Sequence, residues 1–178
     1  ATPIALTTGV GLGAINGILI RGGEALQTAQ KLQTIILDKT GTITYGKPVL
    51  TDVVVADEFR EQNILRLAGG VEKSSEHPLA AAVVEGAAAR GFKLPDAETF
   101  NAIPGHGIEA QVEGHTLLLG NLKLMRDRKI PLGSLEVRAS RLADYGKTPM
   151  YVAIDGKAAG IVAVADTVKE DSREAIRA

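Results

Sequence analysis

The chain of 178 residues contains no cysteine and no tryptophan, and aromatic residues make up only 3% of it. Without cysteine there can be no disulfide bonds, thiolate metal sites or cysteine nucleophiles. The three histidines are scattered along the chain and make a poor metal cage. The scarcity of aromatic rings argues against a stacking platform for single-stranded nucleic acid.

The chain also lacks an excess of charge of either sign. It has 20 basic and 21 acidic residues and a net charge of −1, so nothing in its composition favours binding to nucleic acid or to an anionic membrane surface. The remaining composition, 45% hydrophobic and 23% charged, is that of a globular protein with one domain or two small ones. Partners must therefore be inferred from local sites.

A short apolar, β-branched run at residues 34–37 ends on Asp38 and is followed by a polar turn containing a glycine. Such a run is typical of a buried parallel strand, and chemistry in open α/β sheets collects beyond the carboxyl ends of the strands. Gly41 lets the backbone approach a phosphate, and the hydroxyls of Thr40 and Thr42 can hydrogen-bond phosphoryl oxygens. The pattern indicates a nucleophilic aspartate that accepts a phosphoryl group.

Periodicity and turn signals predict the other elements. Helices are expected at residues 24–31, 57–68 with Asp57 as the cap, 78–91 with Pro78 in the first turn, 134–145 and 170–177. Strands are expected at residues 48–56, 99–103, 107–112, 116–119, 150–154 and 158–165. Gly69 and Gly70 are expected to weaken or interrupt the helix that precedes them. A parallel α/β piece is thus interrupted by an α+β insertion with antiparallel hairpins.

Residues 38–44, Asp-Lys-Thr-Gly-Thr-Ile-Thr, resemble the phosphorylation motif of the P-type ATPases, and residues 75–79, Ser-Glu-His-Pro-Leu, are similar to a segment of their heavy-metal branch. The resemblance covers essentially the whole chain. It implies an α/β plus α+β fold: the N-terminal piece of a haloacid dehalogenase-like Rossmann phosphorylation domain, interrupted by an inserted nucleotide-binding domain whose antiparallel sheet is flanked by helices.

The resemblance also implies the domain boundaries. Residues 1–20 would be the end of a transmembrane helix and the juncture, and residues 21–47 the first part of the phosphorylation domain. Residues 48–162 would be the nucleotide-binding domain and 163–178 a truncated return segment. We expect the chain to start inside a transmembrane helix because Ala-Thr-Pro at its beginning is similar to the sequence after the family's cysteine-proline motif. Hydropathy alone does not indicate this, since Pro3 and four glycines interrupt the uncharged stretch.

The family match implies a role for each residue of the first motif. Asp38 would accept the γ-phosphate of ATP, Lys39 would offset charge on the transferring group, and Thr40 and Thr42 would complete the catalytic set. Asp38 and the backbone carbonyl of Thr40 match ligands of Mg²⁺. Asp166 and Lys169 match the return into the phosphorylation domain.

The nucleotide site implied by the family consists of Glu72, His77, Gly105, Gly107 and Gly120. A histidine before a proline is held in a well-fixed loop, where its ring can stack on adenine or hydrogen-bond to it. Gly-x-Gly-x-x-Ala at residues 105–110 opens a strand rather than a helix, so it is no dinucleotide fingerprint. Gly-Lys-Thr at residues 146–148 lacks the earlier glycine of a P-loop, because Arg141 stands in its place.

Together these features predict the ATP-binding and phosphorylation region of a P-type ATPase that exports a soft metal cation, with copper or silver favoured. Its cofactors would be ATP and Mg²⁺. Its partners would be ATP and the actuator, transmembrane and remaining phosphorylation segments of the same protein, with no nucleic acid. The region would be a cytoplasmic domain of an integral membrane protein, and alone it would bind ATP without efficient turnover.

Three alternatives stay open. One is a zinc- or cadmium-type pump, and another is an ATP-binding module that is inactive on its own. The third is a haloacid dehalogenase-type phosphatase, which would share Asp38 but should carry an acidic residue at position 40, where this chain has Thr40. A potassium-pumping relative is disfavoured by residues 74–79.

Overall fold

The computed structural model describes residues 2–177. The chain divides into two compact units, Ala1–Leu37 and Asp38–Ala178, which are described separately.

The first unit contains helices α1 (Thr2–Ile15) and α2 (Gly23–Ala29). Helix α1 tolerates three glycines and ends before Gly17, which has a left-handed backbone with φ 79°. A Cβ atom on Gly23 would lie 2.2 Å from Leu6 Cδ2, so the start of α2 packs tightly on α1. Among residues 2–177, no helix combines the length and the apolar character needed to cross a membrane.

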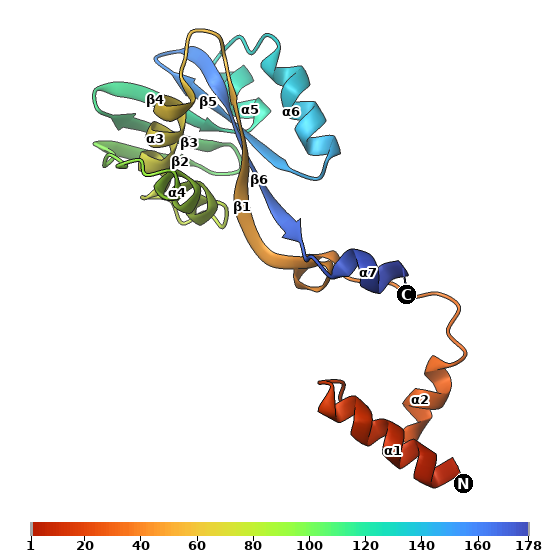
Figure 1. Ribbon diagram of the computed structural model, residues 1–178. Helices are drawn as coiled ribbons and strands as arrows, with labels where there is room; N and C mark the ends of the chain where they lie inside the picture. Colours follow the sequence, from red (N-terminus) through yellow and green to blue (C-terminus); the bar gives the residue numbers. More distant parts are fainter. Residues whose placement is uncertain (1, 178) are drawn as a thin grey trace. The chain divides into compact units, whose positions relative to one another are not determined.

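The second unit is built on a six-stranded sheet with the order β1-β6-β5-β4-β3-β2 (Figure 1). Every neighbouring pair in it is antiparallel. The strands are β1 (Thr44–Val55), β2 (Thr99–Ile103), β3 (Gly107–Val112), β4 (His115–Gly120), β5 (Thr148–Ile154) and β6 (Lys157–Val168). The long strands β1 and β6 extend beyond the rest of the sheet as a two-stranded ribbon (Figure 1).

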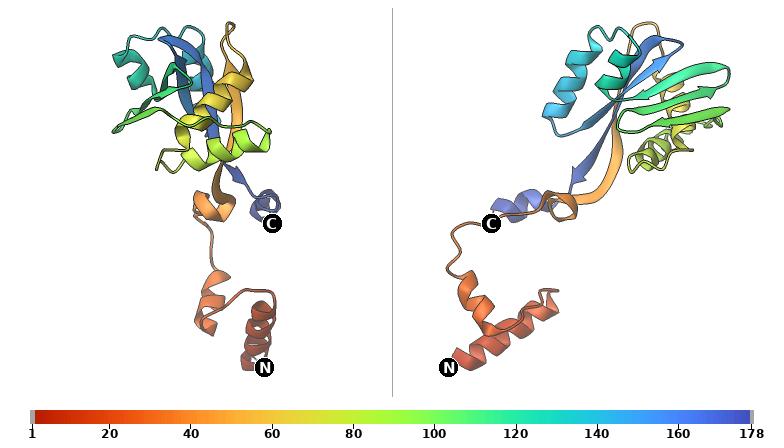
Figure 2. Two further views of the ribbon diagram at one scale, coloured as in Figure 1. Left: turned by 90° about the vertical axis from the view of Figure 1, so that its left-hand side faces the viewer. Right: turned by 180° about the vertical axis from the view of Figure 1, so that it is seen from behind.

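Helices cover both faces of this sheet (Figure 2). Helices α3 (Glu61–Glu72) and α4 (Ala80–Ala89) pack on one face over a core that includes Ile64, Leu119 and Val162. Helices α5 (Leu122–Asp127) and α6 (Leu135–Asp144) pack on the other face, in a core that includes Met125 of α5 and Ile161 of β6. Helix α7 (Ser172–Arg177) follows β6. The predicted antiparallel sheet flanked by helices is therefore confirmed.

The two predicted hairpin turns form as their residues require. Glu113-Gly114 connects β3 to β4 with φ values of 51° and 77°, and Asp155-Gly156 connects β5 to β6 with 50° and 80°. Two successive positive φ angles match the right-handed twist of the flanking strands, and an acidic residue followed by glycine suits this geometry. The Glu113-Gly114 turn fixes the register that brings Gly107 opposite Gly120.

The prediction that Gly69 and Gly70 interrupt a helix is wrong, because α3 runs through both residues to Glu72. A Cβ atom on Gly69 would lie 2.9 Å from Leu94, and one on Gly70 would lie 2.7 Å from the Pro95 carbonyl oxygen. The glycines thus allow the loop after α4 to lie directly against α3. Packing that is distant in sequence outweighs the poor helix propensity of glycine.

The strand predicted at residues 34–37 is absent, and residues 33–38 have no regular secondary structure. Ile36 is 93% exposed. A parallel strand needs neighbouring strands for its backbone hydrogen bonds, and the six-stranded sheet does not include this segment. Two predicted helix starts were also displaced: α3 begins after Arg60 rather than Asp57, and α4 begins after Leu79 rather than at Pro78. Helix α5 was not predicted.

Candidate functional site

A cavity of about 390 Å³ opens beside the β2–β3 turn and the end of β4. All five residues predicted for nucleotide binding line it, from separate elements. Glu72 ends α3, His77 lies in the loop before α4, Gly105 lies in the β2–β3 turn, Gly107 begins β3, and Gly120 ends β4. Apolar side chains form much of the wall, namely those of Leu79, Ile103, Ile108, Leu119 and Met150. An apolar cavity with a few convergent polar groups is the usual form of a small-molecule site.

Glu72 is the buried acid of this cavity. Its residue is only 3% exposed, and its Oε2 atom has no hydrogen-bond partner among the described residues. Burial raises the pKa of the carboxyl above its ordinary value, opposed by a hydrogen bond with Ser75. A buried acceptor without a donor is costly. A ligand that donates a hydrogen bond to Glu72 would therefore be favoured.

His77 is held by its own loop in one neutral tautomer. The Leu79 amide donates to His77 Nδ1 at 3.2 Å, and the His77 amide donates to Ser75 Oγ at 3.2 Å. Because Nδ1 accepts, the proton of the neutral ring is on Nε2. The cavity wall thus presents an acceptor on Glu72 and a donor on His77.

The three glycines that line the cavity are required for different structural reasons. Gly107 and Gly120 face each other across β3 and β4, where a Cβ atom on Gly107 would lie 2.2 Å from the Leu119 carbonyl oxygen. A Cβ atom on Gly120 would lie 2.3 Å from the His106 carbonyl oxygen. Gly105 has φ 71° and open space where its side chain would be. Close backbone packing thus requires two of these glycines before any ligand is considered.

Asn121 is a cavity residue whose role the sequence reasoning missed. Its Nδ2 donates to the Gly105 carbonyl at 2.8 Å, its backbone amide donates to the His106 carbonyl at 2.9 Å, and its Oδ1 caps α5 by accepting from Leu124 N at 3.0 Å. An asparagine before a run of helix formers is an N-cap signal that would have revealed both α5 and this contact. The Asn121 side chain therefore links the glycine loop, which we define as residues 104–107, to the start of α5.

The predicted acceptor Asp38 lies at the start of the second unit and is exposed. The loop that follows, η1 (Lys39–Ile43), is a single irregular turn in which Gly41 has φ 77°. Lys39, Thr40 and Thr42 are exposed in this turn. The predicted catalytic residues therefore share one solvent-facing loop, separate from the residues that line the cavity.

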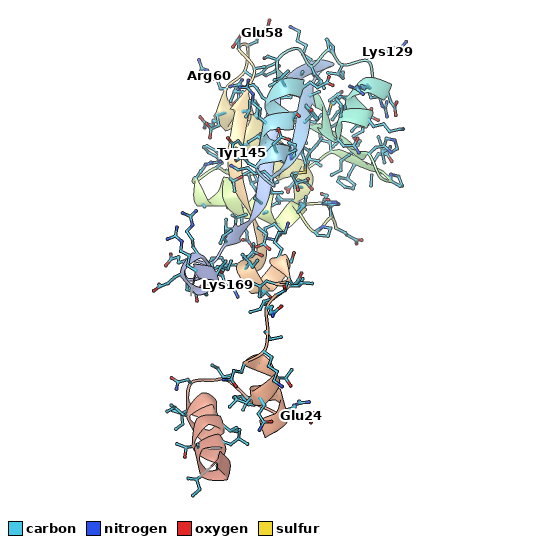
Figure 3. The ribbon with its side chains drawn as sticks, turned by 90° about the vertical axis from the view of Figure 1, so that its right-hand side faces the viewer. Glu24, Glu58, Arg60, Lys129, Tyr145 and Lys169 are labelled. Atoms are coloured by element: carbon cyan, nitrogen blue, oxygen red, sulfur yellow. The ribbon has the colours of Figure 1, made fainter. Side chains whose placement is uncertain are left out.

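Two residues of the return segment, Asp166 and Lys169, make hydrogen bonds at this loop and at the start of β1, and Figure 3 labels Lys169. Asp166 accepts hydrogen bonds from the Thr44 hydroxyl and, at 2.9 Å, from the Gly46 amide. Lys169 donates from Nζ to the Gly41 carbonyl at 3.0 Å and from its amide to the Ile43 carbonyl at 2.9 Å. Lys169 thus contacts the predicted acceptor loop directly, whereas Asp166 contacts the first residues of β1, which follow that loop.

The residues predicted to bind magnesium would provide two oxygen ligands, the Asp38 carboxylate and the Thr40 carbonyl. Among the described residues, no group of three or more histidine or acidic side chains could hold a metal ion. Magnesium usually keeps several waters and binds through one or two carboxylates together with substrate phosphates. The donor set therefore fits a magnesium ion that is partly coordinated by phosphate oxygens.

The ribbon of β1 and β6 connects the cavity to the acceptor loop. Thr148 at the cavity rim pairs with Val164 of β6, and Val168 of β6 pairs with Thr44 next to the loop. Four residues of extended strand span roughly 13 Å. The predicted acceptor loop therefore lies roughly 13 Å along β6 from the strand pair at the cavity rim.

The chain is similar to known proteins in both sequence and structure. A sequence profile of the haloacid dehalogenase-like hydrolases matches residues 32–178. The copper-exporting P-type ATPase of Bacillus subtilis is 45% identical over 176 residues, which are 99% of this chain and 22% of that protein. The chain thus spans about a fifth of the length of this relative.

Solved structures give the same result. A zinc-transporting PIB-type ATPase in its E2.Pi state matches with a TM-score of 0.87 and 36% identity, over 99% of this chain and 28% of that one. The N-domain of HMA8, a copper-transporting P-type ATPase, matches with a TM-score of 0.55 and 30% identity, over 67% of this chain and 99% of that one. The chain therefore belongs to the haloacid dehalogenase-like hydrolase family and, within it, to the heavy-metal-transporting P-type ATPases.

Proposed function

We propose that the cavity binds the adenine ring of ATP. The observation that carries this proposal is the pairing of an unpartnered acceptor, Glu72 Oε2, with a donor, His77 Nε2, on the wall of one apolar cavity. Adenine offers the complementary pair, an amino group that donates and a ring nitrogen that accepts. Its flat apolar faces suit the walls formed by residues such as Ile103 and Met150.

In the whole protein, Asp38 would act as the phosphoryl acceptor. A carboxylate oxygen of Asp38 attacks the γ-phosphorus, the bond from that phosphorus to the β,γ-bridging oxygen breaks, and ADP leaves. Lys39 offsets charge on the transferring group, while the hydroxyls of Thr40 and Thr42 hydrogen-bond its oxygens. A magnesium ion bound with the nucleotide would supply further charge neutralisation.

We further propose that this region is a cytoplasmic domain of a membrane protein and that its phosphorylation drives export of a soft metal cation. The relatives named above support the class, since one exports copper and another transports zinc. The higher identity to the copper exporter favours copper. The remaining segments of the pump would be the partners of this region, and Asp166 with Lys169 would begin the return into the phosphorylation domain.

A second function, that of a nucleotide-binding module with little turnover of its own, is favoured for the isolated chain. The acceptor residues lie in an exposed loop that the described residues do not enclose. A haloacid dehalogenase-type phosphatase is disfavoured, because Thr40 stands where the related phosphatases carry an acid.

Titration calorimetry with ATP tests the proposal. Glu72→Gln removes the charged acceptor and is expected to weaken ATP binding about tenfold, because a hydrogen bond to a charged group contributes roughly 1.5–3 kcal/mol. Glu85→Gln is the matched control, since Glu85 is exposed on α4, pairs with Lys47 and does not line the cavity. Unchanged ATP affinity in Glu72→Gln, or no heat of ATP binding in the parent chain, would refute an adenine site here.

A further inference from the structure

The cavity has an acidic residue but no cation of its own. Glu72 is the single charged carboxylate in its lining, and among the described residues no lysine or arginine lines it. A nucleoside triphosphate carries several negative charges, so a site for it needs positive charge near the phosphates. The question is which neighbouring cation can supply that charge.

Three lysines lie next to residues that line the cavity, and two of them are already committed elsewhere. Lys73 pairs with Asp96, and Lys147 pairs with Asp52, and neither aspartate lines the cavity. Lys123 differs, because its Nζ lies 2.6 Å from Nε2 of His106, a cavity residue in the glycine loop. Lys123 is therefore the cation that contacts the cavity wall.

The ring of His106 is oriented to hold this ammonium group. His106 Nδ1 lies 2.8 Å from the Pro104 carbonyl oxygen, which can only accept, so the ring proton is on Nδ1. The lone pair of the neutral ring is then on Nε2 and accepts from Lys123. The main chain at His106 is fixed as well, because the His106 carbonyl accepts a hydrogen bond from the Asn121 amide.

The contacts of Lys123 leave one N–H donor of its ammonium group available. Its other recorded partner is Asp127 on the same helix, at 3.1 Å, and its side chain is 65% exposed. An ammonium group has three donors, so one remains for a ligand. Exposed pairs four residues apart on a helix contribute only about 0.3–0.5 kcal/mol, so a phosphate can compete with Asp127 for the ammonium group.

We propose that Lys123, presented by His106 at the mouth of the cavity, binds the polyphosphate of the nucleotide and so distinguishes ATP from the bare nucleoside. The inference rests on the proposed adenine site. It assigns a phosphate contact to the lobe that holds the base, separately from the loop that carries Asp38. His106 is a positioning residue in this arrangement, and Asp127 competes with the phosphate.

Binding of ATP and of adenosine to the full chain, measured side by side, tests the proposal. Lys123→Met should weaken ATP binding about five- to tenfold while adenosine affinity stays within about twofold, because adenosine has no phosphate. Lys123→Arg should restore most of the ATP affinity, since it keeps the charge. Asp127→Asn should raise ATP affinity by about two- to threefold by freeing the ammonium group.

Lys157→Met is the matched control. Lys157 is 67% exposed and pairs with Glu58 at 3.2 Å, much as Lys123 pairs with Asp127, but its partner Glu58 does not line the cavity, whereas His106, which Lys123 contacts, does. This variant should bind both ligands as the parent does, and thermal unfolding of each variant checks that the fold is kept.

The outcomes separate this inference from the proposed adenine site. If adenosine binds the parent but Lys123→Met binds ATP as well as the parent does, the phosphate contact is refuted and the adenine site stands. Equal losses for ATP and adenosine would mean that Lys123 supports the loop only, and would also refute the phosphate contact. If neither ligand binds the parent chain, the adenine site itself fails.

Discussion

The cavity and the acceptor loop are built in different ways. Cavity residues such as Ile108 and Leu119 belong to the packed core between the sheet and helices α3 and α4. The acceptor loop has exposed residues at 39–42 and is held by polar contacts from Asp166 and Lys169. The difference indicates that the shape of the cavity depends on packing, whereas the position of the loop after Asp38 depends on a few hydrogen bonds. The two regions should therefore respond separately to mutation.

The largest effect is expected from Gly107→Ala, which disrupts the close packing at the cavity. The new Cβ atom would overlap the Leu119 carbonyl oxygen, and φ 146° suits only glycine. The free energy of unfolding should fall by about 3 kcal/mol in urea titrations. Gly105→Ala, with φ 71° and open space, should cost only about 1 kcal/mol. Equal costs for the two variants would contradict the packing explanation.

Asp166→Ala attacks the polar side. Thr44 and Gly46 lose their shared acceptor, and hydrogen bonds to charged groups contribute roughly 1.5–3 kcal/mol. Amide hydrogen exchange at Gly46 should accelerate by about tenfold or more, while the amide of Leu119 in the core exchanges as before. Faster exchange in both places would show that the two regions are not separable. Asp144→Ala, on the exposed end of α6, is the control.

The smallest effect on stability is expected from Glu72→Gln, and its sign is opposite to that of the other two. Burial raises the folded-state pKa of Glu72, so its contribution to stability is present below the ordinary value of 4.5 and is lost as pH rises through the folded pKa. At pH 7 the variant should therefore be more stable than the parent, by about 1 kcal/mol.

Below pH 4.5 this gain should disappear, because the parent carboxyl is then protonated in both states. Unfolding of both proteins in urea between pH 4 and pH 8 measures the difference. A variant that is less stable than the parent at pH 7 would contradict the account of Glu72 as a buried acid without a full set of partners.

The sequence was sufficient where structure is set by neighbouring residues. The hairpin at Glu113 and Gly114 and the one at Asp155 and Gly156 were predictable because residue types and turn geometry agree locally. That the five residues predicted to bind nucleotide line one cavity could be anticipated only through the family resemblance, since nothing local connects Glu72 on α3 to Gly120 on β4.

The failures share a physical cause, which is dependence on contacts distant in sequence. Gly70 was expected to weaken a helix, but the structure shows why a glycine is needed at this position: Pro95 lies directly against α3 there. The strand at residues 34–37 was expected from composition, but a strand forms only where other strands supply hydrogen bonds. The contact between Lys123 and His106 required the unpredicted helix α5 and so could not be inferred from the sequence.

Backbone-amide chemical shifts of the full chain during titration with ATP test the central claim most directly. The account predicts that the largest shift changes occur at Glu72, His77 and Gly105 to Gly107, with smaller changes at Asp38 and Lys39. Shift changes confined to Asp38 and its loop, with the cavity residues unmoved, would contradict it.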